Sequence, residues 1–170
     1  SVNTLVAARE SLRANVESSG NMLYLATNAI NAPKNSDGQY TFLNIAYAQY
    51  VKGDIDLTTR VKIDSRNSIV MHMGLGIAYP YGNSRILPFE KRYFSGGANG
   101  MRGWTVRTLG PGSYRSKGSN IDFINQSGDM KLDLNVEYRS HLFWRLHSAV
   151  FVDAGNIWTI YNYETQPYGQ

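Results

Sequence analysis

The feature that most constrains the fold is a regular alternation of apolar and polar residues over long segments. From 129 to 138 every even position is apolar and every odd position is polar, which predicts a β-strand with one apolar and one polar face. The segment 69–79 has large apolar residues on one face and mostly small ones, including Gly74 and Gly76, on the other. Looser alternation occurs in 12–17, 44–58 and 146–154. The polar break at Ser140-His141 predicts a turn, and Asn-Ala-Pro and Ser-Asp-Gly within 21–38 predict a loop with a short helical turn. The sequence therefore predicts an all-β fold, an antiparallel meander of about five long strands.

The length of these strands favours a membrane environment. Strands of globular proteins usually have about five or six residues, whereas a strand of about ten residues tilted near 45° rises roughly 23 Å, close to the apolar band of an outer-membrane barrel. Aromatic residues also cluster where the strands should end, as in an interfacial girdle: Tyr79, Tyr81, Phe143, Trp144, Trp158, Tyr161 and Tyr163. A soluble antiparallel sandwich alternates in the same way and is the alternative interpretation. We predict part of a transmembrane β-barrel.

The composition narrows the possible functions. The 170 residues include no cysteine, which excludes disulfides and thiolate metal sites. The net charge of +4 comes from charges of both signs interspersed along the chain, without a basic run, so we expect no nucleic-acid partner. His72, His141 and His147 lack metal-ligand spacing, and no nucleophile stands in a plausible catalytic order. We predict no enzyme activity, no metal and no cofactor.

The predicted number of strands raises a problem of closure. Closed outer-membrane barrels have at least eight strands, and open sheet edges are not tolerated in lipid. The sequence also starts at Ser1, without a methionine, which suits a fragment. We therefore expect residues 1–170 to be a partial outer-membrane barrel domain. In isolation the fragment should associate with copies of itself.

A long connection, 80–128, lies between two predicted strands. It contains "FSGGANGMRGWTVRTLGPG", in which the loop glycines Gly96, Gly97 and Gly100 let the backbone turn sharply ahead of Arg102-Gly103-Trp104. Connections of this length are usually functional or disordered, and the bulky apolar residues of this one argue against disorder. We expect it to fold into the barrel lumen, where Gly74 and Gly76 leave room for it.

A guanidinium carried into the lumen requires carboxylate partners. Glu137 and Asp153 lie on the polar faces of two consecutive predicted strands, so an antiparallel hairpin would place both beside one lumen position. The hypothesis is a clamp of Arg102, Glu137 and Asp153. The alternative is that all three are solvated surface charges.

Four segments carry a resemblance to a known family: "LPFEKRYFSGGANGMRGW", "GPG", "NVEYR" and "VFVDAGNIW". Together they resemble the carboxy-terminal barrel region of the BamA/TamA superfamily of outer-membrane assembly factors, over roughly residues 68–160. The resemblance implies that Arg102-Gly103-Trp104 forms the tip of a folded-in extracellular loop, with Trp104 in place of the usual Phe or Tyr. It also implies that Arg102 contacts Glu137 and the Asp of Asp153-Ala154-Gly155.

The resemblance implies a non-enzymatic function in the outer membrane of a Gram-negative bacterium. The barrel would promote assembly and insertion of unfolded outer-membrane client proteins, with accessory assembly lipoproteins as further partners. Two alternatives are a protein-secretion translocator and a passive outer-membrane channel.

Overall fold

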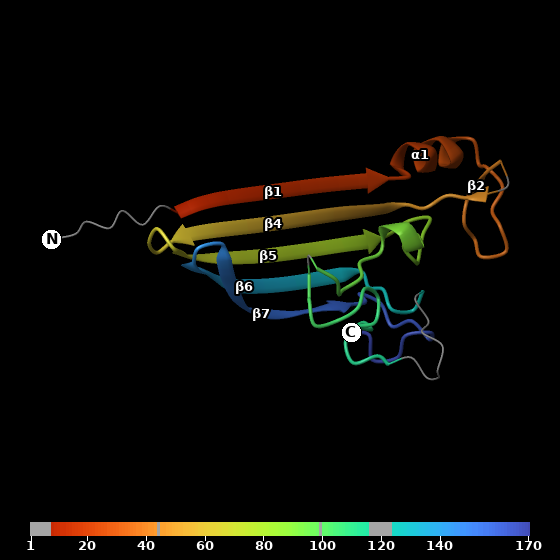
Figure 1. Cartoon of the computed structure of the whole chain (residues 1–170). Helices are drawn as coiled ribbons and strands as arrows, with labels where there is room; N and C mark the ends of the chain where they lie inside the picture. The colour runs from red at the N-terminus through yellow and green to blue at the C-terminus, as the bar shows by residue number, and fades with distance from the viewer. Residues whose placement is uncertain (1–7, 44, 99, 116–123) are drawn as a thin grey trace.

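Five long antiparallel strands form one sheet in a computed structural model that describes residues 8–43, 45–98, 100–115 and 124–170 (Figure 1). They are β1 Ala8–Ser19, β4 Tyr50–Lys62, β5 Asn67–Pro80, β6 Met130–Phe143 and β7 Leu146–Trp158, paired in the order β1-β4-β5-β6-β7. Every pairing is antiparallel, so the predicted long-stranded meander is confirmed. Residues 1–7 of the predicted domain, and 99 and 116–123 of the predicted loop, lie outside the described residues.

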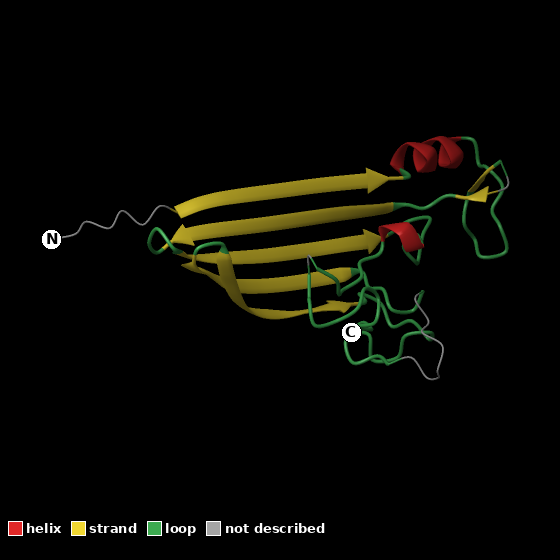
Figure 2. Cartoon of the chain, in the orientation of Figure 1, coloured by secondary structure: helices red, strands yellow, loops and turns green. Residues whose placement is uncertain are grey.

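The two ends of the sheet differ in their connections (Figure 2). At one end, short turns after Lys62 and after Phe143 join neighbouring strands. At the other end lie the long segments, including α1 Asn21–Ala29, the short pair β2 Thr41–Phe42 and β3 Ile45–Ala46, and the 3-10 helix η1 Phe89–Lys91. Outer-membrane barrels have the same asymmetry, with short periplasmic turns and long extracellular loops.

Three segments differ from the structure that the sequence predicted. The segment predicted as one strand from 44 begins at Tyr50, because residues 45–46 pair with 41–42 in a separate hairpin. The short helical turn predicted within the loop 21–38 is a nine-residue helix, α1. The polar break at Ser140-His141 is not a turn. These residues pair with Ser148 and His147 inside the hairpin, and the chain reverses at Trp144, which has φ of 53°.

One face of the sheet is apolar and the other is polar, and the apolar face is uncovered. Apolar side chains of consecutive strands lie opposite each other on this face, as Met73, Leu134 and Ala154 do. Large members of this face remain exposed: Leu12, Val16, Val51, Ile55, Met71, Leu75, Ile77, Leu134, Val136, Val150 and Val152. An apolar face of this extent is costly in water and favourable in lipid.

The other face is polar and carries the loop between β5 and β6, residues 81–129, one residue later at each end than predicted. The buried apolar residues lie at the loop end of the sheet: Tyr50, Ala78, Leu87, Tyr93 and Ile157. The core thus forms between the sheet and the loop, as expected for a loop folded onto the lumen side.

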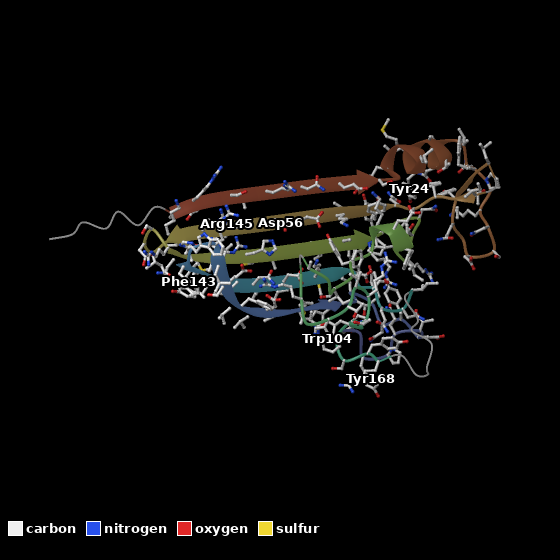
Figure 3. The ribbon with its side chains drawn as sticks, in the orientation of Figure 1. Tyr24, Asp56, Trp104, Phe143, Arg145 and Tyr168 are labelled. Atoms are coloured by element: carbon white, nitrogen blue, oxygen red, sulfur yellow. The ribbon has the colours of Figure 1, made fainter. Side chains whose placement is uncertain are left out.

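Aromatic side chains lie at both ends of the strands, as the sequence predicted. At the loop end the ring centroids of Tyr79 and Tyr161 are 5.9 Å apart. At the turn end Phe143 and Trp144 are exposed, and Arg145 Cζ lies 5.9 Å from the centroid of the Trp144 ring. Phe143 and Arg145 are labelled in Figure 3. Within the described residues, no helix is long and apolar enough to cross a membrane.

Candidate functional site

The base of the long loop is fixed to the polar face of the sheet by Tyr93. Its backbone pairs with Gly128, and its hydroxyl donates to Asp54 Oδ1 at 2.5 Å. The ring lies above Gly76, where a Cβ atom would approach it to 2.5 Å, and Lys52 Nζ is 4.2 Å from the ring centroid. The predicted space at Gly76 is therefore filled by a loop side chain. Burial, and then the hydrogen bond to Asp54, raise the pKa of the Tyr93 phenol far above its ordinary value.

A tight glycine turn precedes the loop tip. Gly96 and Gly97 have φ of 97° and 91°, a region that side chains disfavour, and the Gly97 N–H donates to Trp104 O at 2.9 Å. A Cβ on Gly96 would lie 2.4 Å from Thr105 O. The two glycines let the chain segments before and after the tip approach each other, as their spacing in the sequence suggested.

The loop tip brings Arg102 to two carboxylates. Nη2 and Nε donate to the two oxygens of Asp153 at 2.7 and 2.9 Å, the Arg102 backbone N–H donates to Asp153 Oδ2 at 3.0 Å, and Nη1 donates to Glu137 Oε2 at 2.5 Å. The other oxygen of Glu137 accepts from Arg139. The side chains of Arg102, Glu137 and Asp153 are 24, 14 and 7% exposed. The hydrogen bonds to Asp153, and then to Glu137, raise the pKa of the Arg102 guanidinium.

The strand register explains this arrangement. Glu137 lies directly opposite Phe151, and Asn135 lies opposite Asp153, so the two acids are diagonal neighbours on the lumen face. Arg102 spans this diagonal with its Cζ atom 3.7 Å from the centroid of the Phe151 ring. The guanidinium is therefore held by two carboxylates at its edge and an aromatic ring at its face.

Gly100 and Gly155, two glycines of the predicted site, leave space for the side chain of Asp133. Asp133 is 2% exposed, and Lys131 Nζ lies 2.7 Å from its Oδ2. A Cβ on Gly155 would lie 2.4 Å from Leu132 O and 3.0 Å from Asp133 Oδ1, and one on Gly100 would lie 3.3 Å from Asp133 Oδ2. Any larger residue at Gly155 would displace β6 or this carboxylate.

The remaining two residues of the predicted site do not join the ion pairs. A Cβ on Gly103 would meet open space. Trp104 is 47% exposed and makes no ring contact with another described aromatic or cationic group. Its backbone closes the loop tip, because the Trp104 N–H donates to Met101 O. The structure thus groups Arg102, Glu137 and Asp153 and leaves the Trp104 ring outside.

Sequence reasoning missed Asn135, Phe151 and Tyr93. The positions of Asn135 and Phe151 in their strands could have indicated their roles. Each stands two residues before an acid of the predicted clamp and therefore lies on the same face of its strand. The cluster has a fixed cation and fixed anions but no nucleophile beside a base. Among the residues that the structure describes, no group of three or more His, Asp or Glu side chains is placed to hold a metal ion. The arrangement is suited to holding the loop in place.

Comparisons with known proteins point to one family. A family described as the Omp85 superfamily domain matches residues 11–170. Outer membrane protein assembly factor BamA of Neisseria meningitidis serogroup B is 25% identical over 115 residues, which are 65% of this chain and 14% of that protein. The crystal structure of BamA from Haemophilus ducreyi lacking POTRA domains 1-3 superposes with a TM-score of 0.51 at 16% identity, over 88% of this chain and 39% of that one. The chain thus spans well under two thirds of either relative.

Proposed function

Because this chain belongs to the Omp85 superfamily of Gram-negative outer-membrane proteins, we propose that it takes part in inserting other β-barrel proteins into that membrane. The chain is part of a transmembrane β-barrel, whose uncovered apolar face is turned to lipid. The relative from Neisseria meningitidis is named an assembly factor, but this chain spans only 14% of it. The assembly activity is therefore a proposal for the whole protein.

The observation that carries the proposal is the clamp of Arg102 by Asp153 and Glu137. It joins the tip of the loop to β6 and β7, while Tyr93 and Asp54 join the base of the loop to β4. The loop would then brace the barrel wall from the lumen side, while client strands add at a seam outside this chain. The proposed action is mechanical and involves no covalent chemistry.

We expect the clamp to contribute enough free energy for this role. Removing one partner of a buried ion pair costs about 3 to 5 kcal/mol, because the other charge remains without compensation. Arg102 is partly exposed, so water offsets some of this loss, and we expect about 2 to 4 kcal/mol. A change of that size shifts a loop equilibrium by more than tenfold.

Unfolded outer-membrane proteins are the proposed clients, and accessory lipoproteins are further proposed partners. The sheet has two open edges, β1 and β7, whose backbone groups require pairing in lipid. In the whole barrel further strands would pair with them. For the isolated chain we expect association between copies.

The test compares Arg102→Ala with Arg107→Ala in the full-length protein. Arg107 is on the same loop and contacts the rings of Phe89 and Phe94, but among the described residues it has no carboxylate partner. We expect reduced levels of folded outer-membrane proteins in cells carrying Arg102→Ala and near-normal levels with Arg107→Ala. Normal client levels with Arg102→Ala would contradict the proposal. A steady, ion-selective current in planar bilayers that client protein does not change would favour the passive channel.

A further inference from the structure

Asn135 forms hydrogen bonds with both the loop tip and the clamp. It stands on β6 directly opposite Asp153 of β7. Its Nδ2 donates to Asp153 Oδ1 at 2.9 Å and to the backbone oxygen of Gly100 at 2.8 Å. One amide group therefore connects the loop backbone with the carboxylate that holds Arg102.

The orientation of this amide is fixed from the other side by β5. Asn135 Oδ1 lies 2.9 Å from Nδ1 of His72, the residue directly opposite it on that strand. Because an amide oxygen only accepts, the Nδ1 atom of His72 must carry the proton of this hydrogen bond. His72 Nε2 in turn lies 3.3 Å from Asp56 Oδ1 on β4. A row of polar contacts thus runs across the lumen face from β4 to β7.

An amide side chain at position 135 matches the hydrogen-bonding groups around it. Both N–H groups of Asn135 are used, and its oxygen is used as well. A carboxylate would face Gly100 O and Asp153 with acceptors only, and an aliphatic side chain would leave both without these donors. Gly100 is itself buried, so its carbonyl has little access to water as a substitute partner.

We propose that Asn135 is a positioning residue of the clamp: it orients Asp153 toward Arg102 and holds the loop backbone at Gly100. The inference rests on the proposed function of the clamp, but it can be tested separately. The positioning role of Asn135 can be measured at the backbone N–H of Arg102, which donates to Asp153 Oδ2. This N–H is protected from hydrogen exchange only while the loop tip is in place.

The experiment measures amide hydrogen exchange in the full-length protein in detergent or lipid. For Asn135→Leu we expect exchange around Arg102 to be about tenfold to 100-fold faster, from the loss of hydrogen bonds that include one to a charged group. The reciprocal pair between Tyr93 and Gly128 should keep its protection, because it lies at the loop base. General destabilisation would accelerate both regions. Asn15→Leu, on the same face of β1 and opposite Asp54, is the matched control and should leave exchange around Arg102 unchanged.

The outcomes separate the inference from the proposed function. Unchanged exchange around Arg102, or equal acceleration at the loop base, overturns the role of Asn135. If Asn135→Leu does not fold, Asn135→Ser serves as the second variant, because its hydroxyl is too short to reach both acceptors and the same local acceleration is expected. Faster exchange around Arg102 with normal client assembly supports the positioning role and contradicts the proposed function instead.

Discussion

Replacing Asp153 with asparagine tests the clamp with almost no change of shape. All four contacts of this carboxylate come from donors: Arg102 N and Nε reach Oδ2, and Arg102 Nη2 and Asn135 Nδ2 reach Oδ1. An amide has one oxygen and one NH2 group. Whichever way it points, two donors lose their acceptor and face the NH2 group instead. Asp153→Asn therefore removes two hydrogen bonds and the charge together.

The expected magnitude follows from these contacts. A hydrogen bond to a charged group contributes about 1.5 to 3 kcal/mol. Because the Arg102 side chain is partly exposed, water compensates some of the loss, and we expect about 3 kcal/mol, roughly a 100-fold shift toward a released loop. Glu137→Gln is milder. Its amide oxygen can still face Arg102, so the expected loss is about 1 kcal/mol, roughly fivefold.

The assay uses Arg102 itself as the reporter, since trypsin cleaves after arginine. In full-length protein in membrane vesicles, the bond between Arg102 and Gly103 is protected while the guanidinium is held by its acids. When loop opening is fast relative to cleavage, the cleavage rate follows the fraction of released loop. We expect a rise of about 100-fold for Asp153→Asn and about fivefold for Glu137→Gln.

The control is Asp64→Asn, the same chemical change in the turn at the opposite end of the sheet. Asp64 accepts from the backbone of Arg66 and Asn67 and contacts no part of the described loop, so cleavage at Arg102 should not change. Equal effects of Asp153→Asn and Glu137→Gln, or a larger effect of Glu137→Gln, would refute the reasoning, because the donor count at Asp153 is its basis.

The remaining predictions concern the loop base. Burial raises the pKa of Tyr93 in the folded loop. The contribution of this phenol to the stability of the loop base is therefore complete below its ordinary pKa of about 10 and is lost as the pH rises through the pKa of the folded state. Proteolysis of the base should increase above about pH 10, and Tyr93→Phe should weaken this dependence. Gly76→Ala should displace the Tyr93 ring and raise proteolysis of the base, but have little further effect in Tyr93→Ala. High salt should release the base before the tip, because the Lys91–Glu17 pair is exposed and screened; hydrogen exchange at Tyr93 and Arg102 measures the order.

Much of the fold could be predicted from the sequence, because alternation reports directly which face of a strand is apolar. The alternation in 129–138 predicted which face of β6 is polar, and therefore on which side of the sheet Glu137 lies. The glycines of the tip pointed to a backbone able to fold back. Placing Glu137 beside Asp153 required only that two adjacent strands pair as a hairpin, which is the simplest connection. Placing Arg102 between them also required that the loop fold onto the polar face, which the family resemblance supported.

The errors came from contacts that strand periodicity does not describe. The turn was placed at Ser140-His141 because polar residues usually mark turns, yet His141 and His147 pair across the hairpin with their ring centroids 4.7 Å apart. Asn135 and Phe151 were missed because their roles depend on register, and register is set by the turn that was misplaced. The extent of helix α1 was missed because the Asn-Ala-Pro and Ser-Asp-Gly segments that follow it indicated a loop, and the helix begins after Gly20 without a capping side chain.

The contacts that hold the loop to the sheet are weaker at the loop base than at the loop tip, and this difference affects how the strands of the sheet can move apart. The base reaches β1 through the Lys91–Glu17 ion pair, whose side chains are 38 and 34% exposed, and β4 through Tyr93. The tip reaches β6 and β7 through Arg102, whose partner Asp153 is nearly buried. Any motion that separates β1 and β4 from β6 and β7 must break one of these anchors. Because exposed ion pairs contribute little, the contacts to β1 should yield first, while the loop stays attached to β6 and β7.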